Sequence, residues 1–74
     1  MFKPAGTPMN ELEQVPLGRD ELEALALCDR DGLTQEQAGE RMGVSRGTVQ
    51  RLVSAARRKV ADALAGGKAL LVRP

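Results

Sequence analysis

The residues with the clearest chemical potential are Arg46, Gln50 and Arg51, which fall within two turns of one predicted helix. In the major groove of DNA, arginine can bond guanine O6 and N7, and glutamine can bond adenine N6 and N7. Gly47 lies among them and costs about 1 kcal/mol of helix stability relative to alanine. A base or sugar approaching the backbone would explain that cost, and an unoptimised surface position would explain it equally well. These four residues are our candidates for reading DNA bases.

A second set of polar residues could hold the sugar-phosphate backbone. Ser45 and the free amides of the helix after it suit a phosphate, as do Thr34 and the first turn of the helix before it. Helix capping alone also accounts for both caps. The paired Arg57 and Arg58 could equally complement the C-terminal end of the helix dipole. The predicted phosphate contacts are Thr34, Gln35, Ser45, Thr48, Ser54, Arg57 and Arg58.

Two helices joined by a tight turn are predicted to position these side chains. Thr34 begins a capping box, T-x-x-Q, ahead of a helix over residues 35–42. Gly43 ends that helix, and Ser45 caps a longer helix over residues 46–65. The first helix is short and the turn is tight, and this combination is typical of a helix-turn-helix.

Gly39 supports this interpretation because it is small at the point where the second helix would cross the first. Apolar side chains on both sides of the crossing would then fill it. An ordinary helical hairpin with a glycine in its turn is the alternative. The predicted core consists of Leu25, Cys28, Ala38, Met42, Val44, Val49, Leu52 and Val53.

The fold class that follows is all-α, a small helical bundle with a possible short terminal strand. Phe2 is the only aromatic residue, which disfavours sheet sandwiches and barrels. We expect a further helix near residues 19–31 and a shorter one near 8–14.

We divide the chain into an N-terminal segment over residues 1–16, a helix-turn-helix domain over 17–66, and a tail or short strand over 67–74. The apolar stretch from Leu70 to Val72 could pair with residues around Phe2 or Val15, within one chain or between two. Because a single helix-turn-helix contacts few base pairs, we predict a homodimer.

Charge is divided unevenly along the chain, although the net charge is only +1. Residues 45–74 carry seven cationic side chains and one anionic, whereas residues 17–44 carry three cationic and seven anionic. Such a division lets one face meet a polyanion, although solvated charged helices show it too. The acidic face over residues 19–40 could instead dock on a protein. RNA is a weaker candidate, because the aromatic residues that stack on unpaired bases are missing.

Catalysis is not expected from this composition. There is no histidine and a single cysteine, Cys28, so neither a closed zinc site nor a disulfide can form within the chain. Ser45 and Ser54 have no base to activate them. We predict no enzyme activity, cofactor, metal or small-molecule substrate. The absence of a signal-peptide core and of an 18-residue apolar run predicts a cytoplasmic protein.

The stretch GLTQEQAGERMGVSRGTVQRLVSAARRKV is similar to the fourth region of bacterial sigma factors. A closer resemblance covers nearly the whole chain. FKPAG at Phe2–Gly6, ELEAL at Glu21–Leu25, RMGVSRGTVQRLVSAARRKVADAL and GKAL at Gly67–Leu70 resemble the prokaryotic family catalogued as domain of unknown function 134. The resemblance implies a helix-turn-helix within a helical bundle, with Ser45 to Arg51 facing double-stranded DNA, as in a transcriptional regulator.

Overall fold

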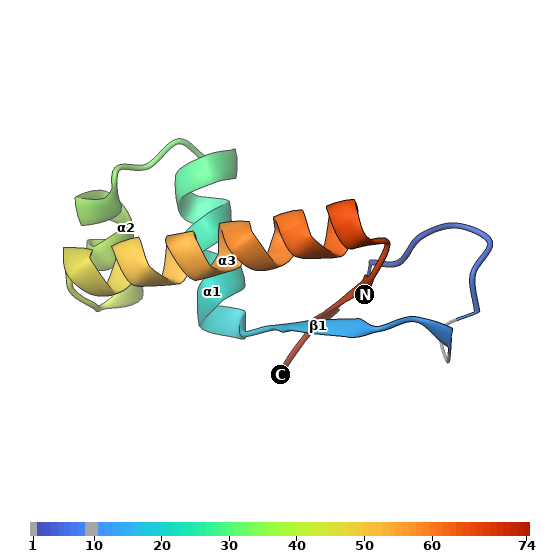
Figure 1. Ribbon diagram of the computed structural model, residues 1–74. Coiled ribbons are helices and arrows are strands. Elements are labelled where there is room, and N and C mark those ends of the chain that lie inside the picture. Colours follow the sequence, from blue (N-terminus) through green and yellow to red (C-terminus); the bar gives the residue numbers. More distant parts are fainter. Residues whose placement is uncertain (1, 9–10) are drawn as a thin grey trace.

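Helices form most of this small protein, and a short sheet pairs a segment before the helices with a segment after them. The computed structural model describes residues 2–8 and 11–74. In Figure 1, α1 crosses the middle of α3, and α2 lies at the end where α3 begins. The elements in chain order are β1 (Gln14–Leu17), α1 (Arg19–Leu25), the π-helix η2 (Ala26–Arg30), α2 (Gln35–Met42), α3 (Arg46–Gly66) and β2 (Ala69–Val72).

The two strands pair in parallel, with Val15 opposite Leu70. Phe2 adds an antiparallel bridge on the other side of β2, where its amide donates to the Leu70 carbonyl at 3.0 Å. Parallel neighbours need a long crossover, and the helical part of the chain supplies it. The sequence predicts that the C-terminal apolar stretch pairs near Phe2 or Val15, and in the structure it pairs with both, within one chain. The all-α prediction is corrected to a mainly helical fold with a two-stranded parallel sheet.

The prediction of a helix near residues 8–14 is wrong for residues 8 and 11–14, the part of this range that the structure describes. The Glu11 amide donates to the Pro8 carbonyl at 3.0 Å, and Gln14 already begins β1. Pairing with β2 gives the backbone from Gln14 onward other hydrogen-bond partners. Residues 9 and 10 lie outside the described part of the chain.

The helix predicted near residues 19–31 begins at Arg19, but its second half is not α-helical. In η2 the Asp31 amide donates to the Ala26 carbonyl, five residues back, at 3.0 Å. Such wide turns are rare and often occur at functional positions. The local sequence carries no signal for one here. The π-helix contains Asp29, which reaches across to α3.

The helices predicted over residues 35–42 and 46–65 are confirmed, and α3 extends one residue further, to Gly66. Gly43 ends α2 with a left-handed φ of 73°. The Val44 amide then donates to the Gly39 carbonyl at 2.9 Å. A methyl group at Gly39 would lie 2.7 Å from the Val44 carbonyl oxygen, so only glycine allows this close approach.

The core lies where α1, α2 and α3 meet, with a second buried layer between α3 and the sheet. Two residues of the predicted core are wrong: Val44 is 38% exposed, and Leu25 lies outside the central cluster and lines an open groove on the other side of α1. The Val44 carbonyl, rather than its side chain, packs against α2. The predicted core also missed Val15, Leu17 and Ala69, which the sheet buries. The central cluster comprises the buried Ala24, Ala38, Val49 and Val53, with Leu27, Cys28, Leu33, Met42 and Leu52 packed against it.

Candidate nucleic-acid interface

Ser45 caps α3 as the sequence predicts. Its Oγ accepts the Thr48 amide at 3.2 Å and lies 3.0 Å from the Thr48 hydroxyl. The Arg51 Nη2 donates to the same Thr48 hydroxyl at 3.2 Å. Because these contacts run from the cap to the second turn, they hold the Arg51 guanidinium along the start of the helix. The sequence analysis does not predict this bond between Thr48 and Arg51, two of the predicted site residues.

Three side chains at the start of α3 face solvent, namely Arg46, Gln50 and Arg51. Val49, between them in sequence, is fully buried, which fixes the register of the helix. Gly47 has open space around it: an added methyl group would come no closer than 3.7 Å to the Arg51 guanidinium. Packing within the protein therefore gives no reason for a glycine at position 47.

Thr34 caps α2 through the predicted capping box. Its Oγ1 accepts a hydrogen bond from the Gln37 backbone amide at 3.1 Å, and the Thr34 backbone amide donates to the Gln37 Oε1 at 2.9 Å. Gln35 follows at the first helical position and is half-buried. The two predicted phosphate-binding caps thus both perform helix capping, with Thr34 and Ser45 exposed to solvent.

Farther along α3, the predicted phosphate contacts divide into two kinds. Ser54 and Arg58 are exposed. Arg57, by contrast, has a partner within the chain: its Nε and Nη2 donate to the Asp29 carboxylate at 2.9 and 2.7 Å. The hydrogen bond from Arg57 lowers the pKa of Asp29 below its ordinary value. This bidentate pair links η2 to α3, which leaves Arg57 less available to a phosphate than Arg58.

A second ion pair fastens α1 to α3. The Lys59 ammonium lies 2.7 Å from the Glu21 carboxylate, whose side chain is only 13% exposed. Burial alone would raise the pKa of Glu21, but the hydrogen bonds from Lys59 and from the Gly18 amide outweigh it and lower the pKa. Sequence reasoning missed both cross-helix pairs, since their partners lie far apart in the chain. Together they fix α1 and η2 against the helix that carries the candidate site.

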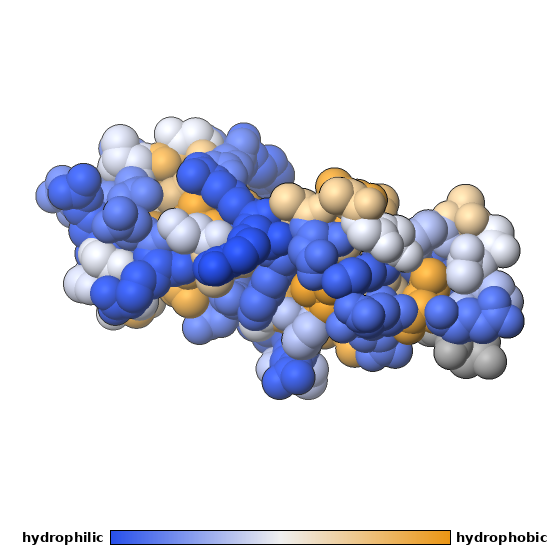
Figure 2. All heavy atoms as spheres, viewed as in Figure 1, coloured by the Kyte–Doolittle hydropathy of each residue, from blue (hydrophilic) through white to orange (hydrophobic). Residues whose placement is uncertain are grey.

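The exposed side of α3 is strongly basic. No acidic residue occurs between Arg41 and Asp62 in the sequence. With Arg57 and Lys59 paired, the remaining cations of α3 in that stretch are Arg46, Arg51 and Arg58. Figure 2 shows hydrophilic surface over most of the end formed by α2 and the start of α3. Such a surface can bind a polyanion.

Other kinds of site find little support in the described part of the chain. Over residues 2–8 and 11–74, no three His, Cys, Asp or Glu side chains come together in a way that could hold a metal ion. None of the helices in those ranges has the length and apolar character to cross a membrane.

Relatives from several organisms match nearly the whole of this chain. A UPF0251 protein of Moorella thermoacetica is 56% identical over 71 residues, which cover 96% of this chain and 48% of the relative. A UPF0251 protein of Desulforudis audaxviator is 55% identical over 71 residues, covering 96% and 46%. The UPF0251 protein of Aeromonas salmonicida is 51% identical over 72 residues, covering 97% and 71%.

The chain thus spans about half the length of the first two of these relatives. No solved structure matches it significantly. The family model described as "Protein of unknown function DUF134" matches residues 1–74, and the chain belongs to that family.

Proposed function

We propose that this chain binds double-stranded DNA in a sequence-specific manner, as a transcriptional regulator, through a helix-turn-helix formed by α2 and α3. The observation that carries the proposal is the start of α3, where Arg46, Gln50 and Arg51 project to solvent from a basic helix. In a helix-turn-helix, the first turns of the second helix enter the major groove and contact base edges. These side chains are of the types that discriminate guanine and adenine there.

The turn between the two helices supports the same function. Gly39 lets the Val44 carbonyl approach α2, and this close approach gives the turn its shape. The first turn of a helix offers amides that suit a phosphate, and α3 begins directly after the exposed Ser45. Backbone contacts of this kind set the position of the protein on the duplex, and base contacts set its specificity.

Gly47 has a role in this proposal. Because the protein itself leaves space for a side chain at position 47, the glycine serves an approach from outside. A base or sugar that comes against the helix backbone would meet a methyl group there. Arg51, whose guanidinium donates to the Thr48 hydroxyl, lies beside Gly47. In this proposal it contacts the same stretch of the DNA major groove.

The second candidate function is a protein-binding module that uses the acidic face over residues 19–40. Glu36 and Glu40 are exposed on α2 and have no side-chain partner among the described residues. The exposed basic side chains at the start of α3 favour DNA. The acidic face lies on α1 and α2, whereas the candidate base-reading residues lie at the start of α3.

DNA-binding measurements distinguish the DNA-binding function from the protein-binding one. Fluorescence anisotropy follows binding to random-sequence and to selected duplexes over a series of salt concentrations. For DNA binding, Arg46→Ala lowers affinity for the selected duplex, and log K falls linearly with log salt. Glu36→Lys serves as the comparison, because it reverses a charge on the acidic face. Unchanged DNA affinity in Arg46→Ala, or binding that does not respond to salt, would refute the proposal.

A further inference from the structure

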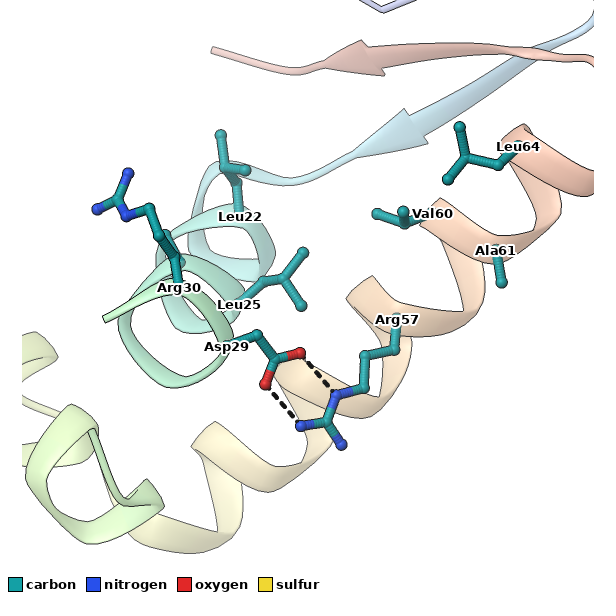
Figure 3. A pocket seen from close by; sticks show the side chains of 9 residues that line it. Leu22, Leu25, Asp29, Arg30, Arg57, Val60, Ala61 and Leu64 are labelled. Atoms are coloured by element: carbon teal, nitrogen blue, oxygen red, sulfur yellow. Dashed lines mark hydrogen bonds and ion pairs between the residues drawn. The ribbon is translucent and has the colours of Figure 1, made fainter. Parts of the chain in front are cut away.

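An apolar groove runs between α1 and the second half of α3, away from the candidate base-reading residues at the start of that helix. Leu22 and Leu25 line it from α1, and Val60 and Leu64 line it from α3. Its volume is about 650 Å³. In Figure 3, Leu25 and Val60 point toward one another across the groove, and the Asp29–Arg57 ion pair closes one end.

The exposed apolar side chains of the molecule gather along this face. Among the described residues, five large hydrophobic side chains are exposed, and four of them line this groove or the two hollows that adjoin it. Leu64 is 60% exposed at the edge of the groove, and Leu22 is 39% exposed on the opposite edge. Phe2 and Val72 extend the face toward the sheet. Monomeric proteins rarely leave contiguous apolar surface of this kind uncovered.

We propose that a second copy of this chain covers the groove, forming a two-fold symmetric homodimer. In a two-fold interface the same patch meets itself, so each protruding residue must find a hollow on an identical surface. Leu64 stands beside the groove that Val60 and Leu25 line, and Leu64 of one copy enters that groove in the other. The face therefore carries both a protrusion and a recess to receive it.

The size of the molecule agrees with this occupant. Its principal extents are 40, 21 and 17 Å. A stable protein–protein interface buries roughly 800 Å² on each partner. A face of 40 by 21 Å offers about that area, so the dimer interface covers nearly the whole of one long side of the molecule.

The charges on this face also permit its own copy to approach. Asp29 and Arg57 neutralise each other at the end of the groove, and Arg30 pairs with Asp31 at 2.7 Å. A face of one sign would repel itself across a two-fold axis, whereas these paired charges do not. The hydrophobic residues can therefore meet without an unbalanced charge between them.

Sedimentation equilibrium without DNA tests the dimer independently of the proposed function. At tens of micromolar the chain is expected to have twice the 7.9 kDa mass of one copy. Leu64→Lys raises the dissociation constant about a hundredfold, since each copy loses one buried leucine and each loss costs about tenfold. Ala61→Lys, in the same groove, also weakens the dimer without removing a large apolar side chain.

Ala65→Lys is the matched control, because Ala65 is exposed on α3 but does not line the groove. The Ala65→Lys variant gains the same charge one turn from Ala61, and we expect it to remain dimeric. Circular dichroism is the check that all three variants keep their helix content. A single-chain mass for the unmodified protein would overturn the proposal, as would equal dissociation of the Ala61→Lys and Ala65→Lys variants. A monomer that still binds DNA would refute the dimer alone.

Discussion

The contact between Gly39 and the Val44 carbonyl determines the turn between α2 and α3, and Gly39→Ala tests it directly. An added methyl group would lie 2.7 Å from that oxygen, well inside normal contact. The oxygen belongs to the backbone of a tight turn, so it cannot move away as the end of a flexible side chain could. We therefore expect the substitution to push the two helices apart.

The expected magnitude combines two opposing terms. Overpacking of a close contact costs about 1–3 kcal/mol. Alanine in a helix interior is more favourable than glycine by about 0.5–1 kcal/mol. Taking the middle of each range, the free energy of unfolding should fall by about 1 kcal/mol, which lowers the melting temperature by about 4–8 °C in a domain of this size.

Gly47→Ala is the matched control, since both positions are helical and receive the same methyl group. At Gly47 the nearest atom is 3.7 Å away, so the gain in helix propensity has no steric cost to offset it. We expect that variant to be more stable by about 0.5–1 kcal/mol and to bind DNA more weakly. Urea unfolding followed by circular dichroism gives both stabilities. If Gly39→Ala is as stable as the unmodified protein, the assigned helix crossing is wrong.

Three further predictions concern stability and the DNA contacts. The pKa values of Asp29 and Glu21 are lowered from 3.8 and 4.5, so both ion pairs stabilise the fold above those values. That contribution is lost as the pH falls through the lowered pKa values. The free energy of unfolding in urea, followed by circular dichroism, should therefore fall less between pH 7 and acidic pH in Asp29→Asn than in the unmodified protein. Arg46→Ala should cost about 1–3 kcal/mol on the preferred DNA site and relax its specificity, whereas Arg58→Ala should weaken all sequences alike, as measured by anisotropy over a salt series. Leu17→Ala should cost about 2–5 kcal/mol in urea unfolding, since Leu17 is 1% exposed under α3.

Short-range signals explain the parts of the fold that the sequence predicted well. Thr34 and Ser45 cap their helices through bonds to residues three positions on, and Gly43 adopts the left-handed conformation that ends α2. These interactions depend on a few neighbouring residues, so their spacing can be read directly. The exposed register of Arg46 and Gln50 follows from the same helix start.

Features that depend on distant partners were predicted poorly. The Asp29–Arg57 pair spans 28 residues, and no local pattern connects its members. The parallel pairing of β1 with β2 joins residues that lie far apart in the chain. The local pattern therefore predicts Gln14 as the end of a helix, although Val15 is also predicted as a candidate partner of the C-terminal apolar stretch. Val44 was placed in the core because it is apolar, although its backbone makes the important contact. The groove beside Leu64 likewise depends on how α1 crosses α3.

Selection of bound duplexes from a random DNA pool at near-physiological salt is the most direct test of DNA recognition by the start of α3. We expect one sequence to be enriched, and we expect Arg46→Ala, Gln50→Ala and Gly47→Ala to reduce its advantage over random DNA. If the unmodified protein enriches no sequence, or if all three variants retain full preference for the same site, the start of α3 does not read DNA.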